Sequence, residues 1–162
     1  STQYLAAELF KSMAGIETQT VPFKSNTLLI TSLRGNELRV AFELLVPVLS
    51  HIKSNTLRAL AVGSDRRFAG LPDVPTIAES GVAGYNVSSW TGIAVPAKTP
   101  TAIVNRLSKE VALAAAVPEV KQTLQEIGIE ARASTPEETR QLMSSEIARW
   151  RNVIEKAKIE RQ

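Results

Sequence analysis

Cysteine is absent from this sequence of 162 residues. Its absence excludes a disulfide framework and thiolate chemistry, although it does not fix the compartment in which the protein works. Long apolar runs are also missing, because no run approaches the roughly 20 residues that a membrane-spanning helix needs. The chain begins Ser1-Thr2-Gln3 without the basic start and apolar core of a secretory signal, so an exported protein would already have lost its signal.

Histidine, clustered charge and common catalytic motifs are equally scarce. A single histidine, His51, cannot form a convincing metal site without cysteines or clustered acids, so we expect no metal and no cofactor. We expect His51 to lie at the surface or to pack at a hinge. The net charge of +3 arises from interspersed acids and bases, which argues against a nucleic-acid-binding surface. The sequence contains no GxSxG turn, GxxxxGK(S/T) loop or HExxH helix.

What is present is the composition of a soluble globular protein, with 44% hydrophobic and 22% charged residues. The first third of the chain alternates between helical and extended patterns. We expect a helix that Ser1 or Thr2 caps and Gly15 stops, followed by helices at 26–34 and 47–53. We expect strands at 16–23, 37–43 and 57–62. This alternation predicts an α/β lobe with a parallel-rich sheet and flanking helices.

The character of the chain changes near residues 85–98. Before this boundary, residues 63–76 are rich in turn residues, and a short helix is expected through Glu79. After the boundary the pattern is mostly helical. Helices are expected to open after Thr99-Pro100, at Pro118 and after Thr135, with a possible strand at 129–132. The apolar stripes of these helices need something to cover, which suggests that the chain is part of a larger fold.

A candidate anion site lies in the stretch VPFKSNT, where an expected strand meets an expected helix. Phe23 and Lys24 are followed there by Ser25, Asn26 and Thr27. A helix N-terminus presents unpaired N–H groups, so an adjacent cation and polar side chains suit a carboxylate. Ser1 and Thr2 join this site if the first helix starts at the same edge of the sheet. The alternative is ordinary helix capping with a solvated Lys24, and spacing alone slightly favours it.

Two further residues have open interpretations. Glu43 follows an apolar strand and is either a ligand-binding or catalytic acid, or the acid that caps the next helix. Trp90 lies in the linking segment and either packs at a hinge or covers a ligand, and hinge packing is favoured. Trp150 lies on the apolar stripe of the last helix and is expected in a core or an interface.

Several longer stretches together resemble one protein family. They are LAAELFKSMAGI at 5–16, VPFK at 21–24, HIKSNTLRALAV at 51–62, the long run at 71–100 that begins LPDVPTIAESG, and TPEETRQLMSSEIARW at 135–150. Taken together, these stretches resemble the Bug-type periplasmic receptors of tripartite tricarboxylate transporters, which bind small carboxylates. The resemblance implies a periplasmic-binding-protein fold of two α/β lobes that close on the ligand, and a membrane permease as partner.

The resemblance also implies how this chain divides. Residues 1–89 correspond to the second, ligand-binding lobe, and residues 90–162 to the hinge crossing and the returning helical segment of an incomplete first lobe. The amino-terminal half of that first lobe would be missing. By the same resemblance, Phe23 stands where the family usually has tyrosine, and 25–27 replaces a glycine-rich turn. Arg39 reverses the charge of a position that is often acidic, whereas Glu43 keeps its charge.

We therefore expect a non-enzymatic periplasmic receptor, or a fragment of one, that binds a small carboxylate weakly or undetectably by itself. The alternative is a truncated receptor that acts only as a structural or oligomerisation module, as a homo-oligomer or with another polypeptide. A hydrolase or transferase that uses Ser25 or Ser89 is poorly supported, because the one histidine lies in a different turn.

Overall fold

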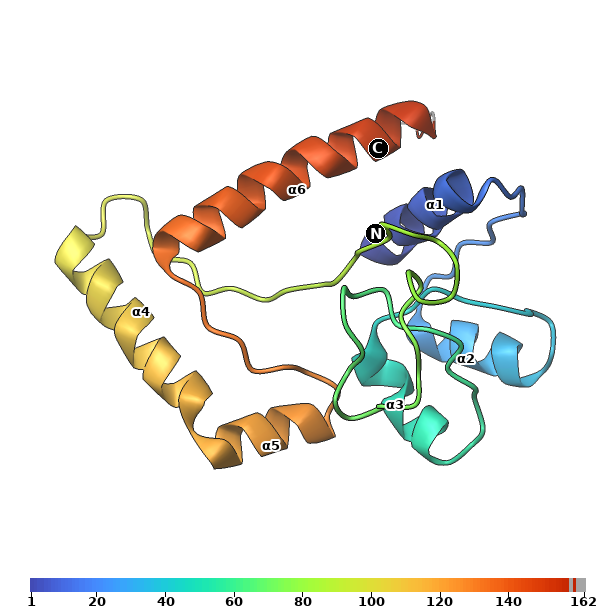
Figure 1. Ribbon diagram of the computed structural model, residues 1–162, viewed down its shortest axis with the longest axis horizontal. Helices are drawn as coiled ribbons and strands as arrows, with labels where there is room; N and C mark the ends of the chain where they lie inside the picture. Colours follow the sequence, from blue (N-terminus) through green and yellow to red (C-terminus); the bar gives the residue numbers. More distant parts are fainter. Residues whose placement is uncertain (158, 160–162) are drawn as a thin grey trace.

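Six helices make up the regular structure of the computed structural model, which describes residues 1–157 and 159 (Figure 1). They are α1 (Thr2–Ala14), α2 (Asn26–Arg34), α3 (Leu45–Lys53), α4 (Thr101–Ala116), α5 (Pro118–Glu126) and α6 (Pro136–Lys156). Among the described residues, no helix has both the length and the apolar character that crossing a bilayer requires.

The helix boundaries follow from local capping. The Ser1 hydroxyl accepts a hydrogen bond from the Tyr4 amide at 3.4 Å, and Gly15 ends α1 in the left-handed conformation with φ of 64°. The Ser25 hydroxyl caps α2 by accepting from the Leu28 amide at 3.3 Å. These contacts confirm the two helices predicted there, while α3 begins two residues before the predicted residue 47.

The helices of the second part also begin where they were predicted. α6 opens with a capping box, because the Thr135 hydroxyl accepts from the Glu138 amide and the Glu138 carboxylate accepts from the Thr135 amide. Gly128 follows α5 with φ of 89°, and a Cβ at this position would lie 3.1 Å from Leu45 Cγ. The end of α5 therefore packs closely against α3.

The predicted parallel sheet is wrong for the residues that the structure describes. The segments at 16–23, 37–43 and 129–132 are extended or bent, and 57–62 contributes only one isolated parallel bridge, between Val62 and Thr76. The backbone bonds at this bridge run from the Val62 amide to Pro75 O and from the Ile77 amide to Val62 O, both at 2.9 Å. A strand needs a neighbour along its whole length, and apart from the bridge at Val62 these segments have none among the residues that the structure describes.

The predicted short helix through Glu79 is likewise replaced by turns. The Thr76 hydroxyl accepts from the Glu79 amide at 3.0 Å, while the Glu79 carboxylate accepts from the Thr76 amide at 2.7 Å. Arg67 pairs with the same carboxylate at 3.0 Å. These reciprocal bonds resemble a capping box and open one helical turn, in which the Ser80 amide donates to the Thr76 carbonyl at 3.1 Å; Gly81, with φ of 113°, ends it.

The buried core is small and lies where α1 meets the segment around Tyr85. Ala6, Ile77, Tyr85 and Val87 are buried together, with Phe10 and other apolar side chains packed around them. The Phe10 ring meets the Tyr85 ring edge-on, with 6.0 Å between centroids. Trp150 of α6 packs against this cluster, as its position on an apolar stripe predicted.

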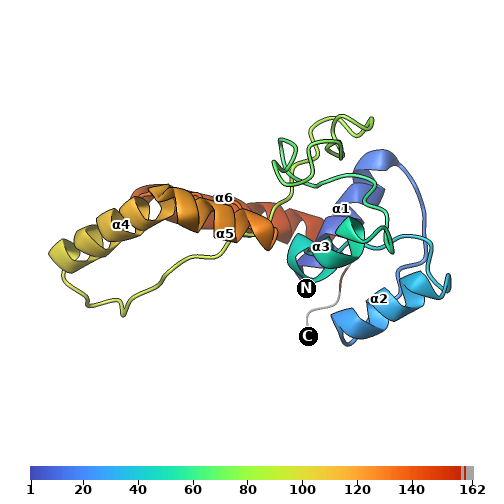
Figure 2. The same cartoon turned by 90° about the horizontal axis from the view of Figure 1, so that it is seen from below.

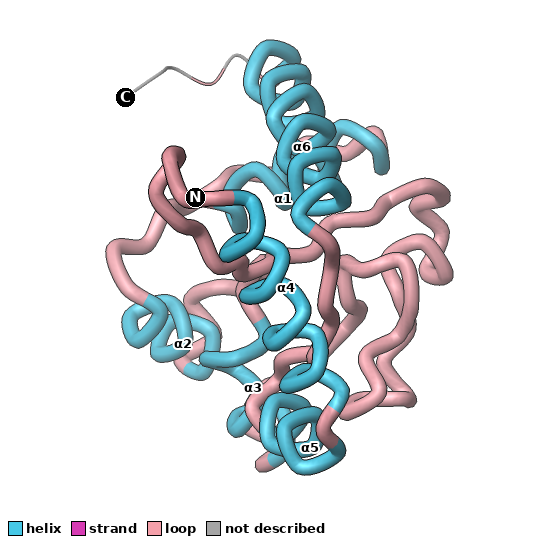
Figure 3. Tube along the Cα trace, turned by 90° about the vertical axis from the view of Figure 1, so that its left-hand side faces the viewer, coloured by secondary structure: helices cyan, strands magenta, loops and turns pink. Residues whose placement is uncertain are grey.

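The helices fall into two groups that α6 connects. Figures 1 and 2 show α1, α2 and α3 with their surrounding loops at one end and α4 at the other, and α5 leads from α4 back toward α3. Figure 3 shows how much of the chain around α1, α2 and α3 is loop rather than helix. α6 contacts α4 and also α1. Lys53 donates to the Glu126 carbonyl at 3.3 Å and Arg66 pairs with Glu130, so α5 and the segment after it also touch the first group.

Candidate functional site

The beginning of α1 lies next to Glu43, as a bond across 40 residues of sequence shows. Gln3 Nε2 donates to Glu43 Oε1 at 2.9 Å, and the Leu44 amide donates to the same oxygen at 2.7 Å. The first turn of α1, which begins at Ser1 and Thr2, therefore lies beside Glu43, two residues before α3 begins. Gln3 was missed by the sequence analysis, because nothing local links it to Glu43.

The turn at 23–27 forms the beginning of α2. Phe23 is half-buried, whereas Lys24, Ser25, Asn26 and Thr27 are exposed. The Ser25 hydroxyl is used as the helix cap. The alternative that this stretch is an ordinary helix cap is therefore confirmed for Ser25. The Lys24 ammonium and the Thr27 hydroxyl remain exposed at the surface.

Free backbone donors remain at both helix beginnings. The amides of Thr2 and Gln3 in α1, and of Asn26 and Thr27 in α2, have no acceptor among the described residues. Each helix start therefore presents unpaired N–H groups, a favourable place for an anion. No hydrogen bond or ion pair within residues 1–157 joins the 23–27 turn to Ser1 or to Glu43.

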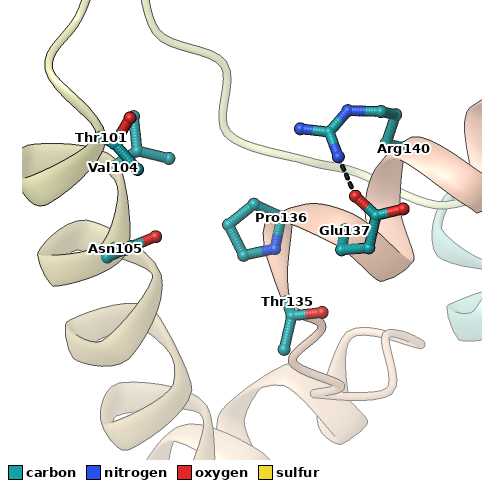
Figure 4. Close-up of a pocket in the computed structure, with 7 residues that line it drawn as sticks. All are labelled: Thr101, Val104, Asn105, Thr135, Pro136, Glu137 and Arg140. Atoms are coloured by element: carbon teal, nitrogen blue, oxygen red, sulfur yellow. Dashed lines mark hydrogen bonds and ion pairs between the residues drawn. The ribbon is translucent and has the colours of Figure 1, made fainter.

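A shallow hollow lies elsewhere, between the beginnings of α4 and α6 (Figure 4), and a second one extends beside it along α4 as far as Ala112. They enclose about 350 and 520 Å³. The smaller hollow is lined by Thr101, Val104, Asn105, Thr135, Pro136, Glu137 and Arg140. Arg140 and Glu137 pair with each other there. Neither hollow is lined by any of the predicted site residues. The polar side chains that line the hollows do not converge on one point, as those of a catalytic site would.

A polar cluster at the crossing between the two groups of helices was not recognised from the sequence. Arg149 donates to the Asn86 carbonyl at 2.7 Å and to Glu146 at 2.8 Å, and Trp150 Nε1 donates to Glu146 at 2.8 Å. The Arg149 guanidinium also lies 4.6 Å from the Trp150 ring centre. The spacing of three and four residues along a helix was the signal that could have revealed this cluster.

Tyr85, one residue before Asn86, is buried next to this polar cluster. Tyr85 is 2% exposed and its hydroxyl donates to the Ala6 carbonyl at 3.0 Å. This burial raises the pKa of the Tyr85 phenol to about 12. By contrast, the hydrogen bond and charge of Arg67, with the Thr76 amide, lower the pKa of Glu79. These shifts accompany structural contacts rather than a reactive centre.

The remaining predicted positions lie away from any recess. Trp90 is 46% exposed, so hinge packing of its ring is incomplete within this chain. His51 lies in α3 and its Nδ1 is 3.2 Å from the Thr56 hydroxyl, a local contact at the end of that helix. Arg39 is exposed.

A comparison with known families identifies the group to which the sequence is related. The model of the tripartite tricarboxylate transporter family receptors matches residues 1–159. The chain belongs to this receptor family. It spans about half the length of the curated relatives that it matches first, for example 45% of a protein from Pseudomonas sp. (strain P51) that is 33% identical over 152 residues, which is 93% of this chain.

Solved receptors of this kind share the fold of the chain. A Rhodopseudomonas palustris protein described with adipate has a TM-score of 0.82 and 34% identity, over 96% of this chain and 52% of that one. The periplasmic binding protein BugD has a TM-score of 0.77 and 26% identity, over 99% and 54%. MatC from the same Rhodopseudomonas species, described with bound malate, has a TM-score of 0.72 and 27% identity, over 95% and 53%. The family is therefore one of solute-binding receptors.

Proposed function

We propose that this chain is the ligand-binding part of a periplasmic receptor that captures a small carboxylate for a tripartite tricarboxylate transporter. The observation that carries the proposal is the match to receptors described with two dicarboxylates, adipate and malate, at 34% and 27% identity. The membrane subunits of the transporter would be its partner. No catalytic step is proposed.

The ligand would be held mainly by groups that favour negative charge. The free amides at the start of α1 and at the start of α2 each carry part of a positive helix dipole, and Lys24 adds a full charge. Ser1, Thr2 and the 25–27 turn would supply hydroxyl and amide side chains, and Phe23 an apolar wall. Glu43 would accept from a donor on the ligand, such as a hydroxyl, through the oxygen that Gln3 leaves free.

We propose further that residues 1–89 act as one lobe and residues 90–162 as the crossing and the returning part of the other. The contacts of α6 with α1 and the Arg149 bond to Asn86 support a junction near residue 89. A clamp of this kind binds because the ligand touches both lobes, which stabilises the closed state. With one lobe incomplete, the chain alone would bind weakly or undetectably.

The test uses a chimera in which this chain replaces the matching part of the Rhodopseudomonas palustris adipate protein. Titration calorimetry with adipate, malate and a monocarboxylate would compare the chimera with the 162-residue chain alone. We expect saturable binding of one carboxylate by the chimera only. A folded chimera that binds none of them would contradict the proposed function, and tight binding by the chain alone would contradict the need for a second lobe.

One substitution examines the proposed anion site within that chimera. Lys24→Met removes the positive charge beside the α2 start while keeping an unbranched side chain, and we expect binding at least 10-fold weaker. Lys121→Met, on the exposed surface of α5, is the matched control and should leave affinity within twofold. Equal effects of the two changes would remove Lys24 from the site.

A further inference from the structure

The last helix, α6, contacts α4 near its beginning and α1 near its end. Pro136 of α6 and Thr101 of α4 line the same hollow, whereas the other end of α6 lies beside α1 (Figures 1 and 4). With 21 residues, α6 is about 32 Å long. A tilt of about 10° around its end therefore moves its beginning by about 5 Å. The angle at which the end of α6 is held thus decides where α4 lies.

The end of α6 is attached to the rest of the chain by apolar side chains. Val153 is the one buried side chain of this helix. Trp150, almost one turn before it, packs against the core cluster that contains Ala6 and Tyr85. Most side chains of residues 137–145, by contrast, are exposed. Because apolar packing is not directional, this attachment keeps the end of α6 in place without fixing the tilt of the helix.

A polar contact one turn before Val153 fixes the tilt. Arg149 donates to the Asn86 carbonyl at 2.7 Å, a bond that joins positions 63 residues apart. Glu146 holds the guanidinium in place, because its carboxylate accepts from Arg149 Nη2 and from Trp150 Nε1, both at 2.8 Å. A second point of attachment at a fixed distance from the first leaves a rigid helix only one direction.

The Asn86 carbonyl is itself a fixed point, because the residues on both sides of it are anchored. Tyr85 is buried, and the Val87 amide donates to the Gly63 carbonyl at 2.7 Å. After Val87 the anchoring stops. Residues 88–95 form no backbone hydrogen bond with any residue that the structure describes. This linker therefore does not fix the direction of α4, and α6 has to do so.

The other contact between the two groups of helices, at the end of α5, is weaker. Lys53 donates to the Glu126 carbonyl at 3.3 Å at the surface, and Arg66 pairs with Glu130 while both side chains are more than half exposed. Exposed pairs of this kind contribute little, because water and salt screen them. Gly128, which lies against α3 there, has no side chain to pack.

We infer that Arg149 is a latch: its bond to the Asn86 carbonyl fixes the angle between the two groups of helices, and breaking that bond frees α6 to tilt around Val153. The latch can open without unfolding of the core, because the Arg149 Nε is buried with no hydrogen-bond partner among the described residues. A buried donor without an acceptor makes the engaged state less favourable than a fully bonded one. The inference concerns the chain without a ligand, so it does not depend on the proposed function.

Distances between spin labels test the latch, and the absence of cysteine from the sequence makes the labelling specific. Ser12→Cys on α1 and Glu110→Cys on α4 replace exposed residues and report on the angle between the two groups. Arg106→Cys on α4 and Gln125→Cys on α5 form a control pair within one group. Double electron–electron resonance on labelled chain, diluted with an excess of unlabelled chain, gives the distance distribution within one molecule.

We expect one narrow distribution for the pair across the two groups in the otherwise unchanged chain. Arg149→Met removes the donor and keeps an unbranched stem, and the isosteric Glu146→Gln removes the charge that holds the guanidinium. Each should broaden the distribution by at least about 5 Å, the displacement that a tilt of about 10° produces. Arg151→Met, which changes an exposed arginine of α6, should leave the distribution unchanged, as should every variant for the control pair.

Far-ultraviolet circular dichroism of each variant separates release of the latch from unfolding, since release should leave the helix content unaltered. Should Arg149→Met reduce the helix content, Glu146→Gln carries the test. Three results would overturn the inference. The first is a distribution that is already broad in the unchanged chain, and the second is a distribution that stays narrow in the folded latch variants. The third is broadening by Arg66→Met that equals that of the latch variants, because the contact at the end of α5 would then set the angle.

Discussion

Tyr85 offers a sharp test of the core that joins α1 to the crossing segment. Its hydroxyl is buried, donates to the Ala6 carbonyl at 3.0 Å, and has its pKa raised to about 12. Tyr85→Phe deletes this bond and the titrating group with little change in shape. At neutral pH the variant should be about 1 kcal/mol less stable, the usual value of one buried hydrogen bond.

The pH dependence gives the same substitution an opposite effect in alkali. A pKa of about 12 in the folded state lies above the ordinary value of 10, so the stability that the neutral phenol contributes is fully present below pH 10 and is lost as pH rises toward 12. The wild-type chain should lose about 2 kcal/mol through Tyr85 by pH 11.5. The variant lacks this loss and should therefore be the more stable protein there, by about 1 kcal/mol.

Urea unfolding followed by far-ultraviolet circular dichroism at pH 7.5, 9.5 and 11.5 measures both effects. Other groups titrate in both proteins and cancel in the difference. Tyr4→Phe, near the start of α1, is the matched control and should change stability at pH 7.5 by less than about 0.5 kcal/mol. A difference between wild type and Tyr85→Phe that stays constant from pH 7.5 to 11.5 would refute the reasoning about burial.

Three other substitutions test neighbouring contacts. Gly63→Ala would place a Cβ 2.6 Å from the Val87 carbonyl oxygen, and should lower the free energy of unfolding by about 1–3 kcal/mol in urea. Hydrogen bonds at the α6 N-cap lower the pKa of Glu138, so its contribution is lost as pH falls below the ordinary value of 4.5. Glu138→Gln should remove that acid-dependent loss of helicity between pH 6 and 3. Arg149→Met breaks the bond to the Asn86 carbonyl, and should speed hydrogen exchange around residue 86 at least 10-fold.

Controls exist for two of these changes. Gly92→Ala brings its Cβ against the movable Trp90 ring at 3.3 Å, so it should cost less than Gly63→Ala, which meets rigid backbone. Arg151→Met changes an exposed arginine next to Trp150 and should leave exchange at residue 86 unaltered. Equal effects within either pair, or an unchanged acid titration in Glu138→Gln, would contradict the assigned contacts.

Local signals predicted the helices of this protein well. The caps at Ser1, Ser25 and Thr135 and the stop at Gly15 depend on bonds between residues three to five apart, which one sequence window contains. The predicted sheet is wrong because strand pairing depends on residues that are far apart in the sequence. A strand is stabilised by a distant neighbour, and within the described part of the chain the segments that were expected to be strands form only the bridge between Val62 and Thr76.

In the candidate site, too, the local contacts were predicted from the sequence and the long-range contact was not. The capping role of Ser25 was a stated alternative and is what its hydroxyl does. The approach of Gln3 to Glu43 crosses 40 residues and had no sequence signal. The ligand-binding role of Lys24 and its neighbours stays a prediction, since it depends on a ligand and on a second lobe.

The most direct test of the carboxylate receptor is a nuclear magnetic resonance titration of the chimera with adipate and malate. Backbone amide shifts should map to Thr2 and Gln3 at the start of α1 and to Asn26 and Thr27 at the start of α2, because their free N–H groups would meet the carboxylate. Shifts confined to the hollow between α4 and α6, around Asn105 and Thr135, would contradict the account.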